Sequence, residues 1–346
     1  MASQKEKKLV DEVSGWLQIF SDGSVDRAWT GPDEVKPLIM PVPPSNDAFA
    51  DGVATKHVVV DQENGVWIRI YLPRTALERE ANNKLGVVIH FHGGGFCVSR
   101  ADWQMYNHFY SRLVTASNVI CVSVDFRLAP EHRLPTAIDD CFAAVAWLGK
   151  VARREKEESW LAQYADFERC VLIGDSSGGN LVHHVAVKAL ACEEELRPLC
   201  VLGGVPLHPG FVRPERSKSE AEIPPDSALL TLEMVDKFLS LSLPVGSTKD
   251  HPITNPMGEQ APPLEKLKFP PFLVGIANRD LIRDTEMEYC EAMRSAGHEV
   301  ETFVSENVGH CFYLNQLAIN FDPHVANETA KLLEGIDRFI SRCFAK

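Results

Sequence analysis

The chain has 346 residues, of which 45% are hydrophobic and 24% are charged. This length excludes a peptide hormone or a small disulfide scaffold and predicts one large domain with additions, or two smaller domains. Because 48 acidic residues outnumber 35 lysines and arginines, the formal net charge is −13. Such a charge repels nucleic acid and anionic membranes, so neither is an expected partner.

The nine cysteines are scattered between Cys97 and Cys343 without a C-x-x-C pair. This pattern predicts neither a disulfide framework nor a zinc site, and it favours a reducing compartment. The polar first residues lead into no apolar signal segment, and no apolar run is long enough to span a bilayer. We therefore expect a cytoplasmic protein; its oligomeric state is left open.

The first predicted elements form a hairpin over residues 56–73, with its turn at Asn64-Gly65. Short apolar runs that predict strands buried on both faces then occur at 86–91, 119–124, 170–173 and 201–207. Predicted helices at 135–152 and 178–191 lie between these strands. The last third continues with strand 272–276, helix 284–296, strand 299–304 and helix 327–341. This alternation predicts an α/β fold with a mostly parallel sheet.

Two segments fall outside the alternation. In residues 1–45, Val10, Val13, Leu17 and Phe20 lie on one helical face, ahead of a Pro-rich stretch. Residues 210–263 are charged and rich in proline, with one predicted helix at 229–241. We expect both segments to form a cap or lid over the sheet.

A G-x-S-x-G motif spans Gly174 to Gly178, between the predicted strand 170–173 and a predicted helix. A nucleophile at the apex of a tight strand-to-helix turn has a strained backbone and needs small neighbours. Ser176 is therefore the predicted nucleophile. The backbone N–H of Ser177, at the amino end of the helix, is a predicted donor to a developing oxyanion.

Three consecutive glycines, Gly93, Gly94 and Gly95, follow His92 just after a predicted strand. Their unshielded N–H groups are expected to line an oxyanion hole. The glycine patterns of phosphate and dinucleotide sites are absent, so no cofactor is expected. His90 and His92 form an H-x-H pair, but no acidic or thiol residue stands at ligand spacing, so no metal is expected.

A nucleophilic serine needs a base and an acid that orients the base. In a sheet of this kind both follow later strands, in the order Ser, acid, His. Asp280 follows the predicted strand 272–276, and His310 follows the predicted strand 299–304. Asp284 is the alternative acid, but we prefer Asp280 because Asp284 is placed to cap the helix that begins there.

Five motifs in this order resemble those of the plant carboxylesterases, a branch of the hormone-sensitive-lipase-like α/β-hydrolases: HGGGF at 92–96, FRLAPEH at 126–132, GDSSGGN at 174–180, DLIRD at 280–284 and GHCF at 309–312. The resemblance covers nearly the whole chain. It implies a single α/β-hydrolase domain over residues 1–346, with an eight-stranded sheet, helices on both faces and a cap formed partly by amino-terminal helices.

The resemblance also implies a cytosolic serine carboxylesterase that acts on small ester substrates through Ser176, His310 and Asp280. Which two of the three glycines donate to the oxyanion stays open. Two alternative functions stay open as well. The related gibberellin receptors bind a hormone on this fold and lack the triad histidine, which is present here as His310. Other relatives are lyases or lactone-forming transferases that use the same site.

Overall fold

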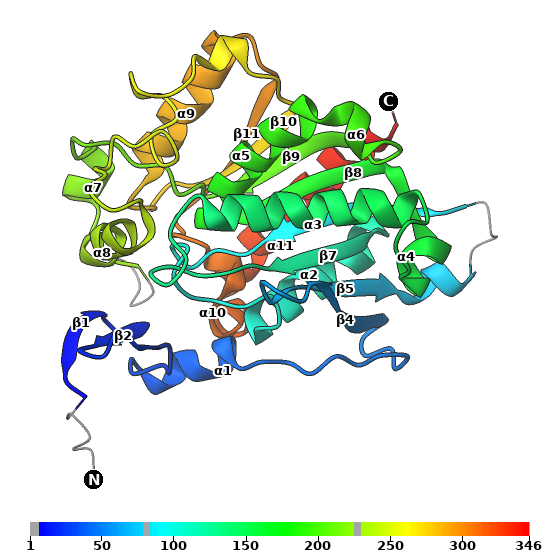
Figure 1. Cartoon of the computed structure of the whole chain (residues 1–346), viewed down its shortest axis with the longest axis horizontal. Coiled ribbons are helices and arrows are strands. Elements are labelled where there is room, and N and C mark those ends of the chain that lie inside the picture. Colours follow the sequence, from blue (N-terminus) through cyan, green and yellow to red (C-terminus); the bar gives the residue numbers. More distant parts are fainter. Residues whose placement is uncertain (1–6, 79–82, 225–229, 346) are drawn as a thin grey trace.

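The computed structural model describes residues 7–78, 83–224 and 230–345 (Figure 1). Its main sheet has eight strands in the order β11-β10-β9-β8-β6-β7-β5-β4. Their bounds are β4 Val53–Asp61, β5 Val66–Pro73, β6 Leu85–Phe91, β7 Ile120–Asp125, β8 Ala165–Asp175, β9 Val201–Leu207, β10 Phe272–Ala277 and β11 Val300–Ser305. The β4–β5 and β5–β7 pairs are antiparallel and the other pairs are parallel. The predicted α/β fold with a mostly parallel sheet is confirmed.

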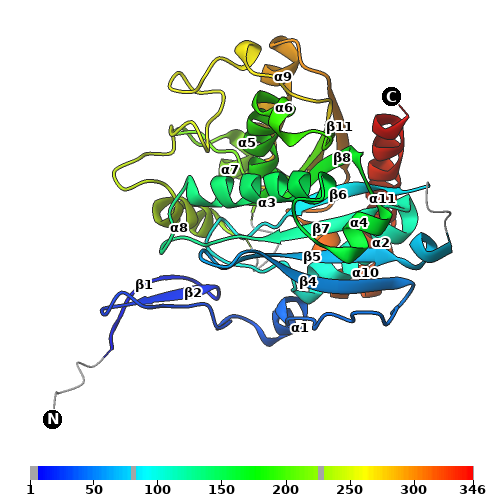
Figure 2. The same cartoon turned by 45° about the vertical axis from the view of Figure 1, so that its right-hand side comes forward.

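Long helices cover both faces of this sheet (Figures 1 and 2). One face carries α3 (Thr136–Ala152), α5 (Ser177–Ala191) and α9 (Arg283–Ser295), and the other carries α2 (Gln104–Ser117) and α11 (Pro323–Phe344). Each face has its own hydrophobic core cluster. Every residue of β6 is buried because both faces are covered, which explains its uninterrupted apolar run.

The remaining helices are short. They are α1 Lys36–Ile39, α4 Ser159–Tyr164, α6 Glu193–Leu196, α7 Lys218–Glu222, α8 Leu232–Ser242 and α10 Gln316–Phe321, with 3-10 turns at Asp33–Val35, Arg74–Glu78, Leu264–Lys266 and Phe312–Leu314. No helix within the described ranges has both the length and the apolar character needed to cross a membrane.

The amino-terminal segment differs from the prediction. Residues 7–45 form a three-stranded sheet of β1 (Leu9–Val13), β2 (Leu17–Phe20) and β3 (Val25–Asp26) before the short α1; residues 1–6 lie outside the described part. The expected amino-terminal helix is wrong because Gly15, at φ 77°, reverses the chain after four or five residues. Apolar residues spaced three and four positions apart fit a helix, but a tight turn interrupts this segment.

The segment 210–263 holds α7 and α8 beside the sheet (Figure 1). The predicted helix 229–241 is observed as α8, where the Thr231 side chain accepts a hydrogen bond from the Met234 N–H as the N-cap. Leu229 and the other residues of 225–229 lie outside the described residues. An ion pair between Lys237 of α8 and Asp11 of β1 joins the two added segments.

The register of the central strands brings their carboxyl ends to one edge of the sheet. Phe91 of β6 pairs with Gly174 of β8, and Asp175 of β8 pairs with Leu207 of β9. Along the same edge, β10 and β11 end side by side. The loops after β6, β8, β10 and β11 therefore meet, and these are the loops that carry the predicted site residues.

Candidate active site

Ser176 lies between β8 and α5 with a φ of 53° and a ψ of −120°. A positive φ is rare and strained for a residue with a side chain, and it holds Ser176 at the apex of the turn. A Cβ on Gly178 would collide with the carbonyl oxygen of Phe91, so glycine is needed for the turn to approach β6. The N–H of Ser176 donates to the Leu207 carbonyl at 2.9 Å, which fixes the turn to β9.

His310 and Asp280 form a close pair behind this turn. His310 Nδ1 lies 2.6 Å from Asp280 Oδ2. The other Asp280 oxygen accepts the N–H of Ile282 at 3.1 Å, and the carboxylate is fully buried. Because a carboxylate only accepts, it holds the His310 proton on Nδ1 and leaves Nε2 with its lone pair.

The alternative acid Asp284 makes different contacts. Its carboxylate accepts the N–H of Ser219 at 2.8 Å and pairs with Arg283. The expectation that it caps its own helix is wrong, because Ile282 is the N-cap residue and Asp284 lies in the first turn of α9. Its carboxylate instead accepts a hydrogen bond from the first turn of α7. Sequence spacing does not show that α7 lies next to Asp284.

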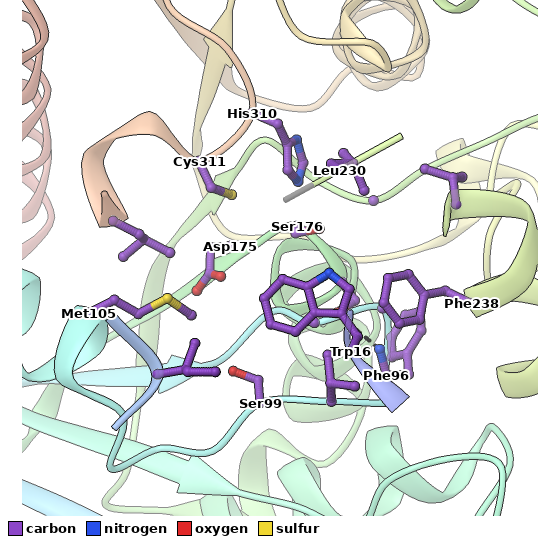
Figure 3. A pocket seen from close by; sticks show the side chains of 18 of the residues that line it. Trp16, Phe96, Ser99, Met105, Asp175, Ser176, Leu230, Phe238, His310 and Cys311 are labelled. Carbon is purple, nitrogen blue, oxygen red and sulfur yellow. Dashed lines mark hydrogen bonds between the residues drawn. The ribbon is translucent and has the colours of Figure 1, made fainter. Parts of the chain in front are cut away.

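Ser176 and His310 line the same cavity, which is drawn in Figure 3. His310 Nε2 is buried and has no hydrogen-bond partner within the described residues. The Ser176–His310 hydrogen bond is therefore not formed in this structure; such bonds are often long without substrate and tighten when it binds.

The glycine loop lies beside Ser176, and its N–H groups are not equivalent. The Gly93 N–H donates to Asp175 Oδ2 at 3.0 Å. Gly94 and Gly95, at φ 99° and 59°, line the cavity, and no acceptor for their N–H groups is found in the described ranges. The Ser177 hydroxyl accepts the Phe96 N–H at 3.3 Å, which joins this loop to the start of α5.

The cavity has a volume of about 130 Å³ and mostly apolar walls. Trp16, Leu38 and Ile39 come from the amino-terminal segment, while Val235 and Phe238 come from α8 (Figure 3). No lysine or arginine of the described part lines it. The helix expected around residues 10–20 is absent, and this segment lines the cavity through Trp16 and the short α1.

Burial and charge oppose each other in the Asp280–His310 pair. Burial would raise the pKa of Asp280, but the charge and hydrogen bond of His310, with smaller contributions from His208 and the Ile282 N–H, together outweigh burial and lower the pKa. Burial would likewise lower the pKa of His310, but the charges and hydrogen bonds of Asp280 and Cys311 together outweigh burial and raise the pKa well above its ordinary value. The pairing with Asp280 therefore raises the affinity of the neutral His310 ring for a proton.

Comparison with known proteins places this arrangement in a family. Residues 88–314 match a family model described as alpha/beta hydrolase fold. The chain is 34% identical over 336 residues to "Probable carboxylesterase 6" of Arabidopsis thaliana, an alignment that covers 96% of this chain and 91% of the relative. It is also 34% identical over 281 residues to "Gibberellin receptor GID1C" of Arabidopsis thaliana, covering 78% of each.

The chain belongs to the plant carboxylesterase branch of the α/β-hydrolase family. The fold extends beyond plants: the hyperthermophilic esterase of the archaeon Pyrobaculum calidifontis superposes with a TM-score of 0.67 at 24% identity, covering 90% of this chain and 88% of the esterase. The plant carboxylesterase resemblance seen in the motifs is confirmed.

Sequence reasoning missed Asp175, a variable residue of the G-x-S-x-G motif. Besides the Gly93 N–H, its carboxylate contacts His90 Nε2 at 3.1 Å and the Tyr106 hydroxyl at 3.2 Å. These contacts link the glycine loop to the serine turn. The only sequence signal was a charged residue beside the nucleophile, and its partners lie 69 to 85 positions away.

Among the residues that the structure describes, two side-chain clusters have the composition of metal sites: His208, His310 and Cys311, and Asp280, Glu286 and His310. Both include His310, whose Nδ1 is engaged with Asp280. In the first cluster His208 Nδ1 accepts the Cys311 N–H at 2.8 Å, so His208 fixes the backbone beside His310. Sequence reasoning did not single out Glu286.

Proposed function

We propose that this chain is a serine carboxylesterase in which Ser176 is the nucleophile, His310 the general base and Asp280 the acid that orients it. The class of enzyme, a carboxylic-ester hydrolase, follows from the family. The observation that carries the residue assignment is the 2.6 Å contact between His310 and Asp280, with the other edge of His310 in the cavity that Ser176 lines.

In the proposed reaction, Ser176 Oγ attacks the ester carbonyl while His310 Nε2 takes its proton. The alcohol leaves with that proton, and an acyl group stays on the serine. Water then attacks the acyl-enzyme, with His310 again as base. Asp280 keeps the imidazole in the required tautomer and stabilises the imidazolium that forms.

The oxyanion hole is assigned to the N–H groups of Gly94, Gly95 and Ser177. The support is that Gly93 already donates to Asp175, whereas the other three lie at the cavity without an acceptor of their own in the described residues. Donors preorganised in this way stabilise the charge that develops on the carbonyl oxygen.

The cavity favours a small, neutral ester. Its volume of about 130 Å³ is close to that of an apolar cavity of ~150 Å³ that holds benzene. A substrate carboxylate would lose its hydration there without meeting a lysine or arginine of the described residues. We therefore propose p-nitrophenyl butyrate as a better substrate than the charged p-nitrophenyl hydrogen glutarate or the long p-nitrophenyl palmitate.

Hormone binding without turnover is the second candidate, because a gibberellin receptor is among the relatives. The presence of His310 beside Asp280 favours catalysis, since binding alone needs no base. Elimination or lactone formation at the same site is the third candidate function. It differs from hydrolysis because water does not accept the acyl group. Product analysis in ¹⁸O-labelled water separates hydrolysis, which places the label in the acid, from the other two.

The direct test is hydrolysis of p-nitrophenyl butyrate by the wild type and by Ser176→Ala. We expect steady turnover by the wild type and a loss of at least about 10⁴-fold in the variant. Turnover that survives in a folded Ser176→Ala protein contradicts the assignment.

A further inference from the structure

Glu286 is a buried carboxyl group that the proposed reaction does not use. It lies in the first turns of α9 with a relative exposure of 0%. Neither of its carboxyl oxygens has a hydrogen-bond partner within the described residues. An ionised carboxylate in such a place would be very costly, so the group is held neutral.

The surroundings of Glu286 are those of the proposed triad. One carboxyl oxygen each of Glu286 and Asp280 and one ring nitrogen of His310 all lie within 4.8 Å of one another. Burial raises the pKa of Glu286 well above its ordinary value, and the charge of Asp280 raises it further, against opposing effects of His310 and Arg283. Burial, together with the charge of Asp280, thus keeps Glu286 protonated.

Glu286 approaches His310 from outside the cavity. It does not line the cavity, whereas His310 does. Its side chain comes from α9, and that of Asp280 comes from the loop between β10 and α9. A substrate in the cavity therefore meets His310, while neither Asp280 nor Glu286 lines the cavity.

We infer that Glu286 is a reserve acid for His310, able to take over the orienting role when Asp280 does not fill it. This inference rests on the proposed function, because it assumes that His310 is the general base. Glu286 acts through His310 and is a positioning residue.

The exchange balances in charge and protons. When Asp280 is shortened to alanine, its negative charge is removed and the space of its carboxylate becomes free. Glu286 then releases its proton to solvent and rotates toward His310, from a separation of at most 4.8 Å between its carboxyl oxygen and a ring nitrogen. Its carboxylate accepts the Nδ1–H bond that Asp280 accepted, and Nε2 can again take the Ser176 proton.

A double-mutant cycle tests the inference. kcat and KM for p-nitrophenyl butyrate are measured for Asp280→Ala, Glu286→Gln and the double variant, with thermal melting as the check of folding. Loss of the acid lowers kcat about 10⁴-fold when nothing replaces it. We expect Asp280→Ala to lose only about 10²- to 10³-fold, and the double variant to fall at least about tenfold further in kcat with little change in KM.

The matched control is Glu291→Gln in the Asp280→Ala background, the same substitution on an exposed residue of the same helix. It should not lower kcat further. If Asp280→Ala does not fold, Asp280→Ser replaces it, because a serine hydroxyl can still accept the Ile282 N–H that Asp280 accepts. When Asp280 is present, Glu286→Gln should lower kcat less than it does in the Asp280→Ala background, which completes the double-mutant cycle.

Equal kcat in Asp280→Ala and in Asp280→Ala/Glu286→Gln overturns the inference, as does an equal further loss from Glu291→Gln. The proposed function fails differently, since then the wild type itself shows no turnover and Ser176→Ala changes nothing. The two failures are thus distinguishable in one set of assays.

Discussion

At the level of single residues, the proton between Asp280 and His310 determines how activity depends on pH. In the proposed reaction His310 works as a base only when neutral. Burial lowers its pKa, but the charges and hydrogen bonds of Asp280 and Cys311 together outweigh burial and raise the pKa above the ordinary value of 6.5. kcat/KM should therefore rise with pH and reach half its maximum above pH 6.5. Asp280→Asn should lower kcat and move this midpoint to lower pH. A wild-type midpoint at or below pH 6.5 contradicts the effect assigned to Asp280.

Glu286 gives a second prediction, on stability. Its pKa is raised in the folded chain above the ordinary 4.5 by burial first and by Asp280 second. The unfolded chain therefore releases this proton as pH rises while the folded chain keeps it, so the wild type loses stability relative to Glu286→Gln. The difference in the free energy of unfolding between Glu286→Gln and the wild type should grow by up to about 1.4 kcal/mol for each pH unit above pH 5. Denaturant unfolding at pH 5, 6 and 7 measures it, and a difference that does not change with pH contradicts a neutral Glu286.

At the level of structural elements, the glycine loop is tested by single methyl groups. A Cβ on Gly95 would collide with Phe238, and φ is 59°, so Gly95→Ala must displace the loop. Loss of one oxyanion donor lowers kcat about 10²- to 10³-fold with KM little affected. Gly65→Ala is the control, because Gly65 has a φ of 71° and open space in the β4–β5 turn. Equal kcat losses in the two variants would show a general effect of strain.

The amino-terminal sheet is tested at Trp16, which lines the cavity and contacts Trp29 at a ring distance of 4.6 Å. Trp16→Ala removes apolar surface of the cavity that the substrate would contact. We expect KM for p-nitrophenyl butyrate to rise about tenfold, equivalent to ~1.4 kcal/mol, with a smaller change in kcat. Val10→Ala, an exposed position of β1 in the same sheet, should leave KM unchanged. An unchanged KM in Trp16→Ala would separate this segment from substrate binding.

At the level of the whole molecule, the sequence predicted the parts of the fold that repeat a local pattern. The apolar runs predicted the central strands, and the helical periodicity predicted α3, α5 and α11. Burial on one or two faces requires apolar residues at such regular positions. The order of Ser176, Asp280 and His310 could be predicted because parallel strands end at one edge. The amino-terminal strands were missed because apolar spacing there fits a helix equally well.

The contacts that sequence could not supply are those between distant buried groups. The Asp175 carboxylate meets the Gly93 N–H across 82 positions, and this contact, rather than the motif, separates Gly93 from Gly94 and Gly95. The buried place of Glu286 depends on how α9 packs against the loop of Asp280. Neither residue follows a spacing rule, so only the folded chain reveals them. A cytoplasmic location stays a prediction.

The most direct test of the central proposal is covalent labelling of Ser176. A fluorophosphonate reacts with a serine only when a base activates it and an oxyanion hole receives the phosphoryl oxygen. Intact-mass and peptide mass spectrometry should find one adduct per chain, on the peptide that contains Ser176, and no adduct in Ser176→Ala. Absence of labelling in the folded wild type, or a label on another residue, would contradict a serine esterase built on Ser176, His310 and Asp280.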